Sequence, residues 1–316
     1  MTLHRLQLRP LSPWCSHWQA DTLFGLLCWT CARTDGTEVL HREIIGPALA
    51  GQPPFVVSDA CPDGFLPLPT ALKAQRVPWS AADRKTVRKA RWITRAGFRQ
   101  FQRGELPSSA ALHRTGGIRE SAEFHNLISR ESNTTSDGGR LFAVPTMTLG
   151  EQRRLTVFAR IVDGYESRFF ELMQCLATYG FGADASVGKG EFEVASDLEP
   201  DPELDDVATP NAVTVLSTFQ PAVTDPTEGF WESFVKFGKL GPDFGLENIF
   251  KRPMLLLRPG ACFWTGSPLR LVGRAIPMPD LLAHDVVAEL LSRGTELVHP
   301  AFGLTVPVQW PVLADR

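Results

Sequence analysis

The segment YGFGADASVGKGEFEV, residues 179–194, decides the fold because the pattern of the chain changes within it. Apolar residues recur at helical spacing before it, and Phe192 and Val194 alternate with glutamates at its end, as in a half-buried strand. Glycines, which tolerate the positive φ angles of tight turns, occupy positions 180, 182, 188 and 190. The segment therefore predicts the end of a helix, a glycine-rich loop and a strand.

The glycine-rich loop does not have the spacing of a nucleotide-binding P-loop. The motif G-x-x-x-x-G-K-[ST] needs glycine in place of Ala183 and a hydroxyl residue in place of Gly190, and it joins a strand to a helix. An ATPase is therefore not expected. We interpret the loop as main chain that lies close to an anionic polymer, with an ordinary glycine-rich turn as the alternative. The N–H groups of residues 188–190 would face phosphates, and Lys189 would add a point charge. The expected contact residues are Ser186, Gly188, Lys189 and Gly190.

Strand and helix patterns occur together at two places before this loop. Residues 154–162, RLTVFARIV, alternate as a strand, and an apolar helical pattern follows them. At the start of the chain, residues 3–9 alternate, and Asp21-Thr22 marks the start of an apolar helix over residues 23–32. These units predict an α+β fold, in which the first ~200 residues form a split βαβ, ferredoxin-like unit with insertions.

An acidic, proline-containing stretch divides the chain. We predict an N-terminal domain of residues 1–197, an acidic linker of residues 198–209 and a C-terminal domain of residues 210–316. The C-terminal part is rich in strand patterns, with short helical pieces near residues 280–293.

The composition is that of a soluble protein, with 43% hydrophobic and 21% charged residues among 316. The first ten residues alternate, which predicts a strand and not a signal peptide, and no apolar run has the length of a membrane span. Six scattered cysteines favour reduced thiols and the cytoplasm. Cys28-x-x-Cys31 lies in an apolar helical run without a second pair, so buried thiols are favoured over a metal site.

Charge is unevenly distributed, although the net charge is only −3. The basic segment, residues 76–103, contains eight lysines and arginines between Arg84 and Arg103 and no acid between those two residues, whereas residues 197–206 contain six acids and no base. Aromatic residues interleave with the bases; they are Trp79, Trp92, Phe98 and Phe101. This pattern favours a phosphate-binding surface with rings available for stacking, with a solvated helix face or a protein contact as alternatives.

A polar finger is predicted over residues 113–145, because two apolar runs flank a segment that contains NTTSDGG. Its arginine, amide and hydroxyl side chains suit phosphates, base edges and 2′-hydroxyl groups of RNA. An ordinary polar hairpin is the alternative. The expected RNA contacts are His125, Asn126, Arg130, Asn133, Thr134, Thr135 and Arg140.

No catalytic motif is evident. His125 could deprotonate a 2′-hydroxyl group in a metal-independent ribonuclease, but the sequence shows no acid–base partner for it. Neither a Ser-His-Asp pattern, nor H-E-x-x-H, nor clustered carboxylates stand out. The sequence therefore predicts no catalytic residue, no metal and no cofactor.

Four stretches together resemble one branch of the RAMP superfamily, namely the fourth subunit of type III-A (Csm) CRISPR effector complexes, which binds the crRNA 5′ handle. The stretches follow the family order and are DTLFGLLCW at 21–29, HNLISRESNTTSDGGRLF at 125–142, GADASVGKGEFEV at 182–194 and RPGACFW at 258–264.

The resemblance implies two ferredoxin-like domains in a non-catalytic, RNA-binding subunit for antiviral defence. The glycine-rich loop would lie against the handle backbone, and the finger would reach into the guide. The implied partners are crRNA, the large polymerase-like and cyclase-like subunit, the adjacent backbone subunit and, indirectly, target RNA. Two alternatives remain open, a pre-crRNA-processing endoribonuclease that uses His125 and a free-standing RNA-binding protein.

Overall fold

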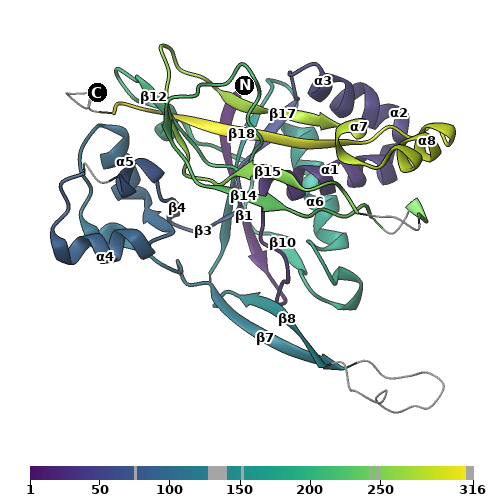
Figure 1. The fold of residues 1–316 in the computed structure, drawn as a ribbon, viewed down its shortest axis with the longest axis horizontal. Helices are drawn as coiled ribbons and strands as arrows, with labels where there is room; N and C mark the ends of the chain where they lie inside the picture. Colours follow the sequence, from purple (N-terminus) through teal and green to yellow (C-terminus); the bar gives the residue numbers. More distant parts are fainter. Residues whose placement is uncertain (75–76, 127–140, 151–152, 242–243, 247–249, 311–316) are drawn as a thin grey trace.

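The computed structural model describes residues 1–74, 77–126, 141–150, 153–241, 244–246 and 250–310 (Figure 1). Helices and several small antiparallel sheets make an α+β fold, as the sequence predicts. Among the described helices, none combines the length and hydropathy needed to cross a membrane.

The first sheet has the strand order β10-β1-β9-β2, and every pair in it is antiparallel. Its strands are β1 (Thr2–Pro10), β2 (Phe55–Val57), β9 (Leu155–Ile161) and β10 (Phe192–Val194), with β3 (Cys61–Pro62) paired to β9 and β11 (Glu199–Pro200) paired to β1. Leu6 and Leu8 lie on one face of β1 and Leu3 on the other, and all three are at most 1% exposed. Both faces of this sheet are therefore covered.

Two long helices, α1 (Ala20–Asp35) and α6 (Glu166–Tyr179), pack against each other and connect strands of this sheet. Phe169, Met173 and Leu176 form the predicted buried face of α6. The start of α1 differs from the expectation, because Asp21 lies inside its first turn and does not cap it. Instead, the carboxylate of Asp59 accepts a hydrogen bond from the main-chain N–H of Ala20 at 2.9 Å. A distant residue thus satisfies an N–H group that the helix leaves open.

The insertion between β2 and β9 contains short elements. They are β4 (Phe65–Pro67), β5 (Trp92–Thr94) and β6 (Leu112–His113), which form a three-stranded sheet, and the helices α4 (Ala81–Lys89) and α5 (Arg95–Gln102). Ser80 and Thr94 cap the two helices, since their hydroxyl groups accept from the N–H groups of Asp83 and Gly97. Short helices complete the insertion and its approach: α2 (Thr37–Leu40), the π-helix His41–Ile45, α3 (Gly46–Leu49), and the 3-10 turns Thr70–Lys73 and Ser109–Ala111.

A two-stranded ribbon extends away from the body of the molecule (Figure 1). It consists of β7 (Arg119–Asn126) and β8 (Leu141–Thr148), paired antiparallel from Arg119↔Thr148 to Asn126↔Leu141. A main-chain bridge between Trp14 and Met147 attaches β8 to the segment after β1. The ribbon lies where the sequence predicts the finger.

The C-terminal half is mainly antiparallel sheet, with the strand order β13-β16-β12-β18-β17. These strands are β12 (Ala212–Val215), β13 (Gly229–Phe230), β16 (Cys262–Trp264), β17 (Leu271–Pro277) and β18 (Val298–Val308). The strands β14 (Ser233–Lys236) and β15 (Met254–Leu257) form a separate pair. The helices α7 (Met278–Leu281) and α8 (His284–Ser292) lie in the predicted helical region.

The hydrophobic core runs through both halves of the chain. One cluster of buried side chains includes Leu23 and Phe24 of α1 together with Phe302 and Leu304 of β18. The segment predicted as an acidic linker is folded onto the body, because β11 pairs with β1 and Leu204 is fully buried. The proposed division at residues 198–209 stays a prediction, but this segment is not a free tether.

Candidate nucleic-acid interface

The glycine-rich loop follows α6 and folds back on itself around Gly190. The N–H of Phe181 donates to the carbonyl of Gly190, and the N–H of Gly190 donates to Pro13, both at 2.8 Å. Gly190 has φ +70°, and a β-carbon there would lie 2.0 Å from the carbonyl oxygen of Phe181. Packing inside the loop therefore requires glycine at this position.

The loop does not offer the main-chain donors that we expected for phosphate. The N–H of Gly188 donates to Ala185 and that of Lys189 to Asp184, each at 3.1 Å, while Gly190 donates to Pro13. The interpretation of these three N–H groups as free phosphate donors is therefore wrong for this conformation. Ser186 and Gly188 are exposed at the loop tip, in and beside the 3-10 turn Ala185–Val187.

Lys189 connects the loop to the ribbon. Its Nζ lies 2.6 Å and 2.7 Å from the two carboxylate oxygens of Glu123 on β7, and its side chain is 19% exposed. The Glu123 carboxylate neutralises the charge of Lys189, and the contact of Lys189 with RNA stays a prediction. The ion pair fixes the loop against the middle of β7 in the ribbon.

The ribbon carries the other expected contacts only in part. His125 Nε2 lies 3.9 Å from Glu123, and its exposed ring stacks on Phe142 of the opposite strand at 5.6 Å between centroids. Asn126 is exposed at the end of β7. The remaining predicted contacts lie outside the described residues; they are Arg130, Asn133, Thr134, Thr135 and Arg140.

The basic segment does not form the predicted stacking surface. Phe98 and Phe101 are at most 1% exposed and Trp79 is 9% exposed, while only Trp92 is half-buried. The two phenylalanines lie three residues apart on α5 and pack into the core, which explains why rings among basic residues are not available for bases. The expectation of stacking rings is therefore wrong for three of the four aromatic residues.

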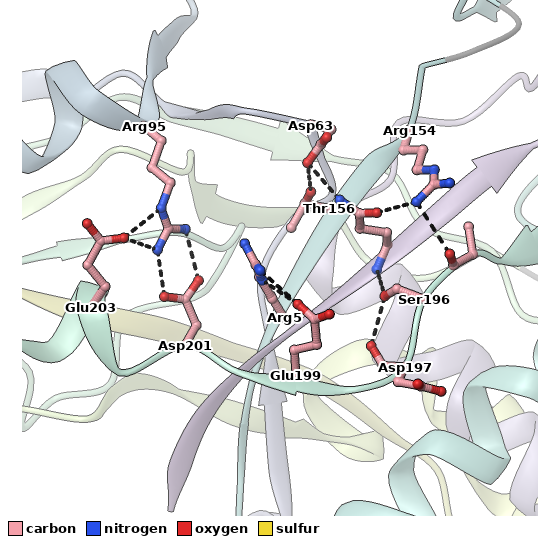
Figure 2. Close-up of polar contacts among 12 residues, drawn as sticks. Arg5, Asp63, Arg95, Arg154, Thr156, Ser196, Asp197, Glu199, Asp201 and Glu203 are labelled. Atoms are coloured by element: carbon pink, nitrogen blue, oxygen red, sulfur yellow. Dashed lines mark hydrogen bonds and ion pairs between the residues drawn. The ribbon is translucent and has the colours of Figure 1, made fainter.

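Two bases of this segment, Arg95 and Arg99, contact residues 197–206, which we call the acidic segment; Figure 2 shows the contacts of Arg95. Arg95 Nη2 lies 2.6 Å from Asp201 and 2.7 Å from Glu203, and Arg99 donates to the carbonyl of Asp206 at 3.0 Å. Lys85, Arg88 and Lys89 remain exposed on α4. The local positive field of the basic segment is thus largely cancelled around α5 and remains on α4.

The acidic segment also covers arginines of the first sheet. Arg5 of β1 pairs with Glu199 at 2.7 Å (Figure 2). Arg160 of β9, which is 1% exposed, makes a two-pronged contact with Asp205 and donates to the carbonyl of Thr305. The fold therefore uses these arginines to attach the acidic segment.

A buried polar cluster joins α1 to the C-terminal half, and sequence reasoning missed it. Asp21 accepts from Lys236 Nζ at 2.7 Å and lies 2.9 Å from His299 Nε2. Burial alone would raise the pKa of Asp21, but the His299 hydrogen bond and Lys236 outweigh it and hold this pKa well below its usual range. Burial lowers the pKa of His299, and it lowers the pKa of the adjacent Lys251 to about 8. The acid at the helix start was visible in the sequence, but its distant partners were not.

Of the Cys28-x-x-Cys31 pair, Cys31 is buried and Cys28 is half-buried. Burial raises the pKa of both Cys28 and Cys31. Within the part of the chain that the structure describes, no group of three or more His, Cys, Asp or Glu side chains could hold a metal ion.

Comparisons with known proteins find similarity only at the level of structure. No family model matches the sequence, and no curated protein matches it. A chain of a crystallised Csm1–Csm4 cassette in complex with cA4 is 13% identical, with a TM-score of 0.63 over 98% of this chain and 99% of that one. A chain of the Csm3–Csm4 subcomplex of the type III-A CRISPR–Cas interference complex is 12% identical, with a TM-score of 0.61 over 98% and 100%.

A further Csm1–Csm4 cassette, in complex with AMPPNP, gives 14% identity and a TM-score of 0.61 over 98% of this chain and 99% of that chain. Csm4 is the component that these complexes share. The likeness extends over nearly the whole of both chains, so this protein has a Csm4-like fold.

Proposed function

We propose that the chain is the crRNA 5′-handle-binding, non-catalytic subunit of a type III-A CRISPR effector complex. The observation that carries this proposal is the full-length likeness to a chain found both with Csm1 and with Csm3. A fold matched from end to end leaves little of the chain for an unrelated additional domain. The cytoplasm, which the reduced cysteines favour, is the compartment that this function needs.

The strand order of the first sheet supports a ferredoxin-like unit within this proposal. In chain order, the main elements are β1, α1, β2, β9, α6 and β10, and the strands lie side by side as β10-β1-β9-β2. This βαββαβ succession, interrupted by the insertion and the ribbon, is that of a split βαβ fold. A second ferredoxin-like unit in the C-terminal half is part of the proposal as well.

Protein partners are proposed from the same comparison and from an exposed apolar patch. The neighbours were crystallised with Csm1 and with Csm3, so we infer a large polymerase-like subunit and a backbone subunit as partners. Val235 and Leu255, which face each other across β14 and β15, are 51% and 58% exposed, and the nearby Phe237 is 73% exposed. Exposed apolar side chains of this kind fit a protein surface better than RNA.

The RNA-contact residues are proposed on their exposure and position. Ser186 and Gly188 at the loop tip and His125 and Asn126 on the ribbon are exposed, so that an RNA strand could run over both the loop and the ribbon. Lys189 is proposed to hold the loop and the ribbon together, since Glu123 neutralises it. The remaining predicted contacts of the finger, Arg130, Asn133, Thr134, Thr135 and Arg140, belong to the same proposal.

Absence of catalysis is also a proposal. His125 has a carboxylate nearby in Glu123, but that carboxylate already accepts two hydrogen bonds from Lys189. A ribonuclease of this kind would need a base and an acid on opposite sides of the cleaved phosphate. The geometry around His125 offers one exposed imidazole stacked on a phenyl ring.

The decisive experiment is co-expression of the chain with its neighbouring genes, followed by sequencing of the RNA that co-purifies. We expect processed crRNA with a uniform 5′ end, together with a large subunit and a backbone subunit. A chain that purifies alone and without RNA would contradict the proposal.

A second assay separates binding from cleavage. Purified chain is incubated with end-labelled repeat RNA, with a scrambled RNA as the control. We expect preferential binding and intact RNA. Cleavage by the purified chain that disappears in His125→Ala would instead support the processing endoribonuclease.

A further inference from the structure

A groove of about 560 Å³ with a mixed polar and apolar lining opens at the root of the ribbon, and none of the predicted RNA contacts lies in it. It lies where β1, the turn between β3 and β4, and the segments that flank the ribbon meet. The residues of its lining that matter for the argument are Gln7, Asp63, Phe65, Gly116, Arg153 and Arg154.

Both arginines of this groove are held by neutral groups. Arg154 Nη1 donates to the side-chain oxygen of Gln7 at 2.5 Å and to the carbonyl of Ala195 at 3.4 Å. Arg153 Nη1 donates to the carbonyl of Gly116 at 3.3 Å. Neutral acceptors orient a guanidinium group without cancelling its charge, so both exposed arginines keep a full positive charge at the groove.

The acid of the groove does not cancel this charge. Asp63 Oδ1 accepts from the hydroxyl of Thr156 at 2.9 Å and from the amide of Gln7 at 3.2 Å (Figure 2). Thr156 and Gln7 hold the Asp63 carboxylate by these two hydrogen bonds. Among the described residues, Asp63 forms no ion pair with Arg153 or Arg154. Two guanidinium groups and one carboxylate leave the groove with a net positive charge that favours an anion.

The position of Arg153 depends on a glycine turn. Gly117 has φ +94°, and a β-carbon there would lie 2.0 Å from Arg153 Nη1. Gly116 has φ +58°, and a β-carbon there would lie 2.7 Å from the Pro62 side chain and 3.2 Å from the Trp92 side chain. Gly117 thus leaves the space across which the Arg153 side chain reaches the groove.

An aromatic ring lies in the wall of the same groove. Phe65 is half-buried, and its ring meets His113 edge to face, with centroids 4.9 Å apart and an interplanar angle of 72°. A ring that is fixed by a neighbour and open on the groove side can stack on a base. Guanidinium groups beside such a ring match the phosphate and the base of a single nucleotide.

We propose that this groove binds one nucleotide of single-stranded RNA, with its phosphate between Arg153 and Arg154 and its base on Phe65. The inference rests on the proposed function, because the RNA is the strand that the chain binds there. It adds a site at the root of the ribbon to the contacts expected at the loop tip and along the ribbon. Gln7 acts as a positioning residue, since it holds both Arg154 and Asp63.

The test measures the affinity of the chain for handle RNA as a function of salt concentration. The variants are Arg153→Ala, Arg154→Ala and Phe65→Leu, and the matched control is Arg5→Ala. Arg5 lies on the same sheet with a side chain that is 43% exposed, but it is paired with Glu199. Thermal unfolding of each variant establishes that it is folded.

Loss of one phosphate contact lowers the slope of log affinity against log salt by about 0.7 for a single strand, which corresponds to a roughly fourfold weaker affinity at 0.15 M salt. We expect this change for each arginine variant, a similar weakening without a change in slope for Phe65→Leu, and neither effect for Arg5→Ala.

The possible failures are distinguishable. RNA binding by the wild type with unchanged slopes in both arginine variants would overturn the groove and leave the proposed function intact. Arginine variants that lose a partner subunit but keep the RNA slope would assign the groove to a protein and overturn the inference. A wild-type chain without affinity for RNA, alone or assembled, would overturn both.

Discussion

The arginines under the acidic segment and the arginines at the root of the ribbon lie near the same sheet but meet different partners. Arg5, Arg95 and Arg160 each contact a carboxylate of residues 197–206. Arg153 and Arg154 contact carbonyl and amide oxygens. The carboxylates neutralise the charges of the first group within the folded chain, whereas the arginines of the second group can still attract an anionic ligand. The difference teaches that a basic residue is available to bind RNA only if the fold places no carboxylate within ion-pair distance of its side chain.

The acidic segment can neutralise its arginines because it is itself fixed. The pairing of β11 with β1 places Glu199 beside Arg5, and the buried Leu204 anchors the 3-10 turn Pro202–Asp205. Carboxylates held at contact distance act at a high effective concentration, so they compete well with phosphates from solution. Four predictions test this contrast, from the largest expected effect to the smallest.

The largest effect is expected for Arg160→Met, which removes a buried cation from the neutralised group. Arg160 is 1% exposed, and its loss leaves Asp205 and the carbonyl of Thr305 without their main donor. We expect the free energy of unfolding to fall by about 3 kcal/mol. Urea unfolding measures this, and RNA affinity per folded molecule should not change.

Arg270→Met is the matched control for that variant. Arg270 pairs with the same carboxylate of Asp205 at 3.3 Å, but its side chain is 61% exposed. Its loss should cost less than about 1 kcal/mol, as for most exposed ion pairs. Equal effects of the two variants would show that burial does not distinguish these arginines.

The second effect concerns Lys251, a half-buried cation that contacts His299 and, among the described residues, no carboxylate directly. It lies 3.3 Å from His299 Nδ1, and Asp21 and Lys236 lie beyond that ring. Burial lowers the pKa of Lys251 to about 8, whereas an unfolded lysine titrates near ~10.4. Between these values the unfolded chain binds more protons, so this residue makes stability rise with pH.

We expect this contribution to reach about 2 kcal/mol between pH 8 and 10. Urea unfolding over this pH range gives the difference in unfolding free energy between the wild type and Lys251→Met. This difference separates the contribution of Lys251 from that of the thiols, which titrate in both proteins. A difference that stays constant with pH would mean that Lys251 titrates normally.

The third effect tests Lys189, which belongs to the neutralised side of the comparison although it lies in the expected RNA-binding loop. Lys189→Ala should weaken RNA binding roughly fivefold, because the loss of an ion pair worth about 1 kcal/mol frees the loop from the ribbon. The slope of log affinity against log salt should change by less than the value of about 0.7 that corresponds to one phosphate contact, since Glu123 already cancels this charge.

A charge exchange distinguishes positioning from phosphate binding. The double variant Lys189→Glu with Glu123→Lys should recover much of the affinity that either single change loses, as measured by RNA binding at several salt concentrations. If the double variant recovers no affinity and Lys189→Ala lowers the salt slope by the full value of one phosphate contact, then Lys189 binds a phosphate directly.

The smallest effect is expected for Arg5→Met. Its pair with Glu199 is exposed, with side chains 43% and 50% accessible, so its removal should cost less than about 1 kcal/mol in urea unfolding. A cost above about 2 kcal/mol would show that the acidic segment depends on this single exposed contact.

Much of the local structure followed from the sequence, because alternation and helical spacing can be recognised from a few neighbouring residues. The patterns at residues 154–162 and 169–176 became β9 and α6, and the polar finger became a ribbon over its described part. The same reasoning failed for Phe98 and Phe101, since the spacing that puts them on one helix face also buries them. It failed for the N–H groups of Gly188 to Gly190, because a glycine-rich segment says nothing of which carbonyls accept from it.

The sequence by itself determined the succession of strands and helices and the presence of separate basic and acidic segments. Only the tertiary structure decided which charges cancel. Arg95 meets Asp201 across 106 residues and Lys236 meets Asp21 across 215, whereas the partners of Arg154 among the described residues are neutral groups. Propensity and periodicity act over one or two turns of chain, but an ion pair depends on sheet register and on packing between distant segments.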